Sequence, residues 1–232
     1  MLTLRRADER GRSRTDWLDS RHTFSFGGYH HPQHVNFGPL RVINEDVVAG
    51  GGGFPPHPHR DMEIVTYPLS GALEHKDSLG TGSVIRPGEI QRMSAGTGIV
   101  HSEFNASKTE PVHFLQIWIV PSQTGHAPSY EQKTIDADAV RNKFARIASN
   151  EPLPNEVRIR QDAEIYAARF DGEEEAIHRL QPGRKLWLQV ARGEVEVGGT
   201  RLGAGDGAAI VDEENVLIHA RGPSEVLLFD VA

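Results

Sequence analysis

Two short segments carry potential metal ligands that lie two residues apart. His57 and His59 follow a stretch rich in glycine and proline, and His101 and Glu103 follow a Gly-Thr-Gly turn. Residues i and i+2 of a β-strand share one face of the sheet. Two such strands that face each other inside a barrel bring three imidazoles and one carboxylate to a single space. The spacing therefore predicts a mononuclear metal site held by β-strands.

Each pair alone is a weak signal, because the chain contains 12 histidines. Glycines and prolines before a pair also mark a loop that enters a strand, which any β-protein needs. The signal gains strength because the second pair follows about 40 residues after the first and also lies behind a glycine-rich turn. We therefore interpret the two pairs as one metal site.

Turn-forming residues punctuate the whole chain. Its 24 glycines and 14 prolines separate short apolar segments, as expected for many short strands. No apolar run approaches the ~18 residues of a membrane span, and the N-terminus lacks the apolar core of a signal peptide. The chain has no cysteine, which excludes disulfides, thiolate ligands and a cysteine nucleophile. These features predict an all-β, cytoplasmic protein without a membrane span.

The charge distribution disfavours nucleic acid as a partner. The net charge is −7 with neutral histidines, and such a surface repels a phosphate backbone. Five arginines gather within the first 14 residues, but Asp8, Glu9 and Asp16 are interleaved with them or follow directly. We interpret this segment as a solvated surface and expect no direct contact with nucleic acid.

The pattern of strands predicts two domains and a linker. Residues 1–122 form a first β-rich half, and residues 149–232 repeat the pattern more faintly. Residues 123–148 are predicted to form the linker, with a short helix over residues 136–143. The segment 202–210 echoes the Pro-Gly corner after residue 85, which indicates an internal duplication. The second copy has neither ligand pair, so we expect it to bind no metal.

Several motifs resemble known proteins. The run from Gly51 through His57 and His59 to Glu63 is similar to the first motif of the cupin superfamily, and a looser second motif leads to His101. The segments 17–26, 37–46, 57–67 and 92–103 closely resemble the bacterial pirin family. The resemblance implies a bicupin, in which two antiparallel, jelly-roll β-barrels lie face to face and only the N-terminal barrel holds a metal.

The resemblance also assigns the metal ligands. Carried over residue by residue, His57, His59, His101 and Glu103 match the ligands of the family. Glu63 is a ligand in other cupins and is expected here to support the site without binding the metal. The other histidines are expected in barrel walls or hydrogen bonds (His75, His113) or in loops (His22, His30, His31, His34, His126).

Three imidazoles and one carboxylate suit one divalent transition metal ion. Fe(II) is the first expectation, and Mn, Cu, Ni, Co and Zn are the alternatives. The absence of thiolates disfavours a structural zinc site. Four protein ligands leave one or two coordination positions for water, substrate or O2, which is typical of a catalytic site.

The pirin resemblance implies quercetin 2,3-dioxygenase activity. In this reaction O2 opens the ring of a flavonol, or of a similar enolic small molecule, and carbon monoxide is released. Glu103 is the one ligand that can also accept a proton, so it is the candidate general base. Phe54, Met93 and Gln116, together with Trp118, are candidates for the substrate pocket.

A second function remains open from the sequence. Pirin-like proteins also resemble metal-dependent interaction proteins that partner transcription regulators. The alternative is therefore a metal- or redox-dependent interaction protein that modulates such a regulator through a protein partner. The chain contains no helix-turn-helix pattern, so this alternative involves no direct DNA contact.

Overall fold

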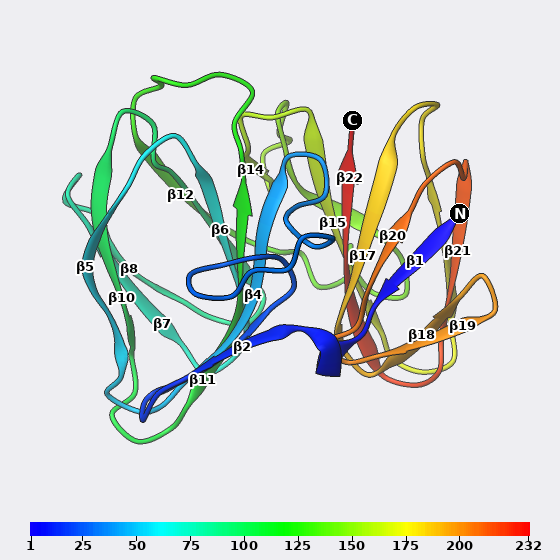
Figure 1. Ribbon diagram of the computed structural model, residues 1–232, viewed down its shortest axis with the longest axis horizontal. Helices are drawn as coiled ribbons and strands as arrows, with labels where there is room; N and C mark the ends of the chain where they lie inside the picture. The colour runs from blue at the N-terminus through cyan, green and yellow to red at the C-terminus, as the bar shows by residue number, and fades with distance from the viewer. The chain divides into compact units, whose positions relative to one another are not determined.

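The chain folds almost entirely into β-strands. The computed structural model describes residues 1–232 and divides into two compact units (Figure 1). The first unit comprises residues 11–134 and 157–161, and the second comprises residues 1–10, 135–156 and 162–232. The predicted all-β architecture with two β-domains is therefore confirmed. The predicted domain boundaries at residues 122 and 148 stay a prediction.

Two antiparallel sheets build the first unit. The larger sheet has the order β12-β9-β6-β11-β4-β3-β2, and the smaller has the order β5-β10-β7-β8. The strands of the larger sheet are β12 (Ser129–Thr134), β9 (Glu89–Ser94), β6 (Glu63–Ser70), β11 (Val112–Ile119), β4 (Leu40–Val48), β3 (Leu18–His22) and β2 (Gly11–Arg14). Those of the smaller sheet are β5 (Gly53–His59), β10 (Ile99–Asn105), β7 (Leu73–Asp77) and β8 (Gly82–Ile85). The short strand β14 (Val157–Arg158) also belongs to this unit.

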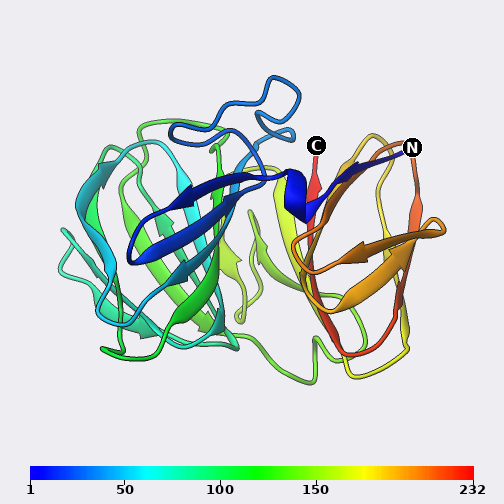
Figure 2. The same ribbon diagram turned by 60° about the horizontal axis from the view of Figure 1, so that its bottom comes forward.

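The first unit has a core made by the apolar faces of these strands. Strand β11 is apolar along most of its length and is buried at six of its eight positions, because it lies between β6 and β4. Val48, Leu73 and Phe114 form one buried cluster, against which Phe54 packs from β5. Full burial of each such side chain contributes about 1.5–3 kcal/mol. The loop between β3 and β4 extends beyond the strands, as the blue segment in Figure 2 shows.

The second unit repeats the strand order of the first. One sheet contains β1-β20-β17-β22-β15-β13 in that order, and the other contains β16-β21-β18-β19. Strand for strand, this matches β12-β9-β6-β11-β4-β3 and β5-β10-β7-β8, as the predicted internal duplication requires. The strands of the second unit are β1 (Leu2–Arg5), β13 (Ala145–Ser149), β15 (Ala163–Phe170), β16 (Glu175–Arg179), β17 (Lys185–Arg192), β18 (Glu194–Val197), β19 (Thr200–Gly203), β20 (Gly207–Ile210), β21 (Asn215–Ala220) and β22 (Ser224–Val231).

The short helix predicted over residues 136–143 is wrong. These residues form turns, because the side chain of Asp136 accepts a hydrogen bond from the backbone N–H of Asp138 at 3.0 Å. Asn142 has a φ of +54°, which a right-handed helix cannot accommodate. The only helix in the structure is the single 3-10 turn η1 (Ala7–Glu9), and no helix has the length and apolar character needed to cross a membrane.

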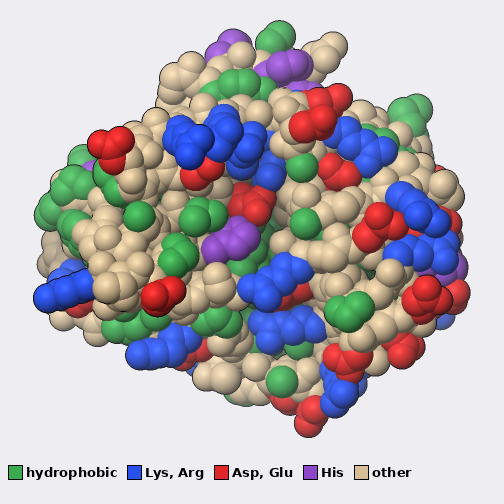
Figure 3. All heavy atoms as spheres, turned by 90° about the horizontal axis from the view of Figure 1, so that it is seen from below, with side chains coloured by type: hydrophobic (Ala, Val, Ile, Leu, Met, Phe, Trp, Pro, Cys, Tyr) green, Lys and Arg blue, Asp and Glu red, His purple; other side chains and the backbone are tan.

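Charges of both signs share the surface. The face in Figure 3 carries basic and acidic side chains interspersed, with apolar side chains scattered among them. Exposed ion pairs of the protein include Arg12 with Asp19 and Arg141 with Asp171. Exposed pairs of this kind contribute little to stability, about 0–1 kcal/mol each.

Candidate metal centre

Two neighbouring strands of the smaller sheet bring the predicted ligand pairs together. Strand β5 pairs antiparallel with β10, and His57 lies opposite His101 in this pairing. The ring centroids of His57, His59 and His101 are 4.4–4.9 Å apart. The potential ligand nitrogens of these three side chains all lie within 4.8 Å of one another. The three imidazoles therefore surround one space.

Glu103 joins this group through His101. A register shift separates His101 from Glu103 on β10, and Glu103 lies opposite Phe54 of β5. The ligand atoms of Glu103, His101 and His75 also lie within 4.8 Å of one another. His75 is fully buried on β7, the other neighbour of β10. The structure thus adds His75 to the surroundings of the four predicted ligands.

The hydrogen bonds of the rings leave nitrogen lone pairs available. The Nδ1 of His57 lies 2.8 Å from the carbonyl oxygen of Pro55, which can only accept, so His57 donates from Nδ1 and its Nε2 is free of a proton. The Nε2 of His101 is buried and has no hydrogen-bond partner. A buried polar atom without a partner costs about 1–3 kcal/mol. A metal ion would satisfy this atom, so the residues present fit the expected cofactor.

Burial keeps these rings neutral. Burial, together with the charges of neighbouring histidines, lowers the pKa of His59 to about 4 and that of His101 to about 2. Burial also lowers the pKa of His75, although Asp77 opposes this effect. Neutral imidazole is the form that binds metals. At neutral pH the rings are therefore in the protonation state that a metal requires.

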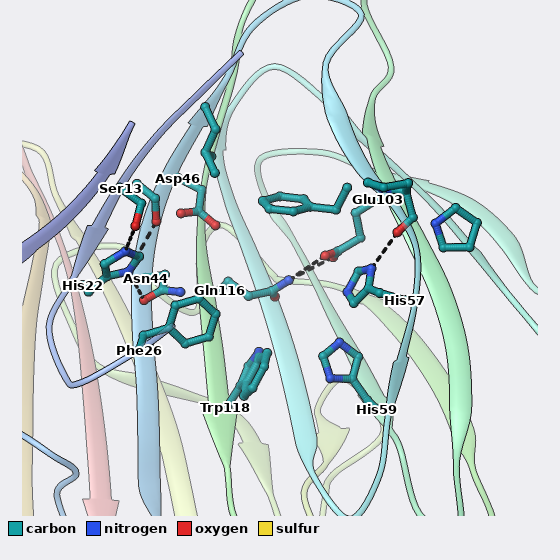
Figure 4. A pocket seen from close by; sticks show the side chains of 15 residues that line it. Ser13, His22, Phe26, Asn44, Asp46, His57, His59, Glu103, Gln116 and Trp118 are labelled. Atoms are coloured by element: carbon teal, nitrogen blue, oxygen red, sulfur yellow. Dashed lines mark hydrogen bonds between the residues drawn. The ribbon is translucent and has the colours of Figure 1, made fainter. Parts of the chain in front are cut away.

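Glu103 is held in place by an amide. The Nε2 of Gln116 donates to both carboxylate oxygens of Glu103, at 3.0 and 2.8 Å (Figure 4). Thr66 donates from its hydroxyl to the Oε1 of Gln116 at 2.9 Å, which fixes the orientation of the amide. Burial, with a smaller contribution from the charge of nearby Asp46, raises the pKa of Glu103 to about 7, although the bond from Gln116 opposes this shift. Without a metal, Glu103 therefore exchanges a proton near neutral pH.

A pocket of about 440 Å³ opens beside these ligands. His57, His59 and Glu103 line one side of it (Figure 4), and His101 is not among its lining residues. Its apolar walls are Leu18, Phe26, Phe54, Pro55, Pro56 and Trp118. A cavity of this volume, mostly apolar with a few polar groups, is typical of a small-molecule site.

The side of the pocket away from His57 and His59 is mostly polar. His22 shares hydrogen bonds of 2.8 Å with Asn44 and with Ser13. Asp46 is buried, and its Oδ1 has no hydrogen-bond partner. The indole nitrogen of Trp118 is likewise buried without a partner. Two of the residues that line the pocket thus carry a buried acceptor and a buried donor without partners.

The structure places most, but not all, of the predicted pocket residues in this wall. Phe54, Gln116 and Trp118 line the pocket. Met93 does not, because its side of β9 packs into a buried cluster with Ile64, Ala95 and Ile99. The list of predicted loop histidines also needs one correction. His22 is the last residue of β3 and is almost fully buried.

Glu63 lies apart from the ligands. It accepts hydrogen bonds from the hydroxyl of Ser94 at 2.8 Å and from the backbone N–H of Arg160 at 3.3 Å. Sequence reasoning did not single out His22, Asn44 or Asp46 as pocket residues. All three lie on β3 and β4, within segments whose pirin resemblance was the only available signal.

Comparisons with known proteins cover both halves of the chain. The family described as Pirin matches residues 4–119, and the family described as Quercetinase C-terminal cupin domain matches residues 146–231. The chain is 46% identical to quercetin 2,3-dioxygenase of Escherichia coli K12, covering 100% of this chain and 99% of that protein. It is 40% identical to a pirin-like protein of Caulobacter vibrioides, covering 100% of both chains.

A solved structure matches the fold closely. The crystal structure of a bacterial pirin from Escherichia coli in complex with nickel(II) superposes with a TM-score of 0.94 at 45% identity. The match covers 100% of this chain and 99% of that chain. A relative with this fold has thus been crystallised with a transition metal.

Proposed function

The chain belongs to the pirin family, and on this premise we propose that it is a metal-dependent quercetin 2,3-dioxygenase. The enzyme opens the ring of a flavonol with O2 and releases carbon monoxide. The observation that carries this function is the cluster of three imidazoles and one carboxylate beside an apolar pocket. The named relatives favour the enzyme over the interaction protein that the sequence left open.

The proposed metal ligands are His57, His59, His101 and Glu103. Nitrogen and carboxylate donors together suit Fe(II), Mn(II), Ni(II), Co(II), Cu(II) or Zn(II), and we propose Fe(II) as the native ion. When bound, the ion supplies Lewis acidity, which lowers the pKa of a flavonol hydroxyl that it contacts. The unpartnered Nε2 of His101 supports this assignment, because no protein group satisfies it.

Glu103 is the proposed general base. Its carboxylate lines the pocket, where it can accept the proton of the flavonol 3-hydroxyl. In the metal-free protein, burial raises its pKa to about 7. The bonds from Gln116 keep the carboxylate aimed at one position. A base held in this way needs no rearrangement before it takes the proton.

The pocket walls suit a flat, hydroxylated substrate. Phe54 and Trp118 offer aromatic surfaces, and Trp118 itself is braced edge-on by Phe26 at a centroid distance of 5.4 Å. The free Oδ1 of Asp46 can accept from a substrate hydroxyl, and the free N–H of Trp118 can donate to a carbonyl. A flavonol presents both kinds of group.

Aerobic turnover of quercetin tests the function. The metal content is measured first, and then the loss of flavonol absorbance is followed together with carbon monoxide. We expect one carbon monoxide per flavonol consumed, and no turnover in His101→Ala. Absence of turnover with every first-row metal, despite tight metal binding, would overturn the enzymatic function.

A further inference from the structure

We propose that His75 and Asp77 are positioning residues that fix which ring nitrogen His101 presents to the metal. The inference deepens the proposed function, because it rests on the metal centre described above. It assigns a role to a buried histidine that the proposed reaction does not otherwise use.

The three side chains form one buried chain of hydrogen bonds. The Nδ1 of His101 lies 3.5 Å from the Nδ1 of His75, and the Nε2 of His75 lies 3.0 Å from the Oδ2 of Asp77. The side chains of His75 and Asp77 are both 0% exposed, so water does not compete for these bonds. Strand β7 carries both residues and pairs directly with β10.

Asp77 determines which atom is the donor in each of these hydrogen bonds. The Asp77 carboxylate only accepts, and its Oδ1 already accepts from the backbone N–H groups of Leu79 and Thr81 at 2.9 and 3.1 Å. Its Oδ2 therefore accepts from the Nε2–H of His75. A neutral His75 with its proton on Nε2 has a lone pair on Nδ1.

The lone pair of His75 in turn sets the state of His101. It accepts from the Nδ1–H of His101, which leaves the Nε2 of His101 without a proton. This is the atom that lies buried without any partner in the structure. The chain of hydrogen bonds thus aims an unprotonated nitrogen at the metal position. Outer partners of this kind orient metal-bound histidines and raise their basicity.

The same geometry argues that His75 is not itself a ligand. His75, His101 and Glu103 lie close enough to form a ligand group of their own. However, both ring nitrogens of His75 are engaged, one with Asp77 and one with His101. The ring is also packed against Tyr130 at a centroid distance of 4.9 Å. No nitrogen of His75 remains for a metal.

Asp77→Asn provides a sharp test. It exchanges the donor and acceptor roles along these hydrogen bonds, and the new side chain has nearly the same shape. The two backbone N–H groups keep the amide oxygen of the new side chain in place, so its NH2 group faces His75. His75 must then accept at Nε2 and carry its proton on Nδ1, where it confronts the Nδ1–H of His101. His101 can avoid this clash only by moving its proton to Nε2, the nitrogen that the metal needs.

The readout is metal affinity in the full-length protein. We expect Asp77→Asn to bind Ni(II) about 10- to 100-fold more weakly than the unmodified protein, measured by competition with a chelator. Glu74→Gln is the matched control, because it removes one negative charge from the same strand at a partly exposed ion pair with Lys76. This control should bind Ni(II) like the unmodified protein. An unchanged affinity in Asp77→Asn would overturn the proposal.

A second pair of variants covers the case in which Asp77→Asn does not fold. His75→Gln keeps an oxygen that can accept from His101, whereas His75→Phe keeps the ring shape without any acceptor. We expect the affinity for Ni(II) to fall more in the Phe variant than in the Gln variant. Equal losses in both would contradict the acceptor role.

Pulsed electron paramagnetic resonance of the Cu(II)-loaded protein separates the two roles of His75. The number of bound imidazoles should be the same in His75→Gln and the unmodified protein, and a loss of one would identify His75 as a ligand instead. Turnover is measured in parallel. If the Ni(II) affinity of the variants changes as expected but the unmodified protein does not consume quercetin, the positioning role stands and the enzymatic function fails.

Discussion

Glu103 combines two roles at the scale of the single residue, because it is both a proposed ligand and the proposed base. Glu103→Gln keeps the shape but removes the basic carboxylate. We expect kcat for quercetin to fall by about 10²- to 10⁴-fold, the usual contribution of a general base. Metal content is measured in the same samples, so that a loss of metal is distinguished from a loss of the base.

Glu110→Gln is the control for this change. Glu110 is an exposed residue of the same unit and does not line the pocket, so its substitution should leave kcat unchanged. Full turnover by Glu103→Gln with its metal bound would remove Glu103 from the role of base.

Asp46 makes the free energy of unfolding depend on pH. Burial raises the pKa of Asp46 to about 7, and the charge of Glu45 adds to this effect. The folded protein therefore binds more protons than the unfolded chain between about pH 4 and pH 7. Over that window the free energy of unfolding falls as the pH rises, and the loss is complete above pH 7.

Asp46→Asn removes this loss, because an amide does not ionise. In the metal-free protein we expect the variant to gain stability relative to the unmodified chain as the pH rises from 5.5 to 8.5. The change should be on the order of 1 kcal/mol or more. Urea unfolding at both pH values measures it. A difference between the two proteins that is independent of pH would show that Asp46 is not protonated in the folded state.

The pairing of β5 with β10 is the element on which the site depends. Gly53 lies opposite Phe104 in this pairing, and a Cβ added at Gly53 would come within 2.5 Å of the carbonyl oxygen of Glu103. Gly53→Ala therefore forces the two strands apart. We expect a loss of about 1–3 kcal/mol in the free energy of unfolding. Ni(II) affinity should also fall, because His57 moves relative to His101.

Gly82→Ala is the matched control on strand β8 of the same sheet, where a Cβ meets nothing within 4 Å. It should change neither stability nor Ni(II) binding appreciably. If Gly53→Ala also binds Ni(II) normally, the spacing of the two strands is less critical to the site than the structure implies.

The spacing of two residues was sufficient to predict which side chains share a face of β5 and of β10. Side chains alternate between the two faces of a strand, so the spacing of two residues in the local sequence shows whether they share a face. The partner strands and the register shift between His101 and Glu103 are set by pairing between segments that are distant in the chain. This is why the sequence alone did not place His75, which reaches the site from a third strand.

Polar residues of the larger sheet were missed for a related reason. Asp46 and His22 lie on strands that carry no local signal for a pocket, and only the folding of one sheet against the other brings them near His57. Met93 was misplaced because its apolar character suits a core cluster as well as a pocket wall. The predicted linker helix failed because local turns at Asp136 and Asn142 outweighed the weak helical pattern.

At the scale of the whole molecule, both units have the same strand order, but only the first unit contains clusters of potential metal ligands. The groups of three or more clustered ligand side chains all lie in the first unit. The histidines of the second unit are paired with carboxylates instead, His178 with Asp230 at 3.0 Å and His219 with Glu175 at 2.7 Å. The two units thus share a strand order, and the clustered potential ligands lie in the first unit.

Metal binding should therefore stabilise the protein through the first unit alone. A ligand that binds only the folded state raises the free energy of unfolding by about 2.7 kcal/mol at a concentration of 100 times its Kd. We expect chelator-treated protein to gain several degrees in Tm when Ni(II) is added, measured by thermal unfolding. His57→Ala removes one ligand of the cluster and should abolish most of this gain.

His178→Ala separates this effect from general destabilisation. It removes the buried partner of Asp230 in the second unit and should lower Tm in the absence of metal, because it leaves a buried carboxylate with one partner fewer. The rise in Tm on addition of Ni(II) should nevertheless match that of the unmodified protein, since the ligands of the first unit are intact. A rise that survives in His57→Ala, or that disappears in His178→Ala, would place the metal outside the cluster on β5 and β10.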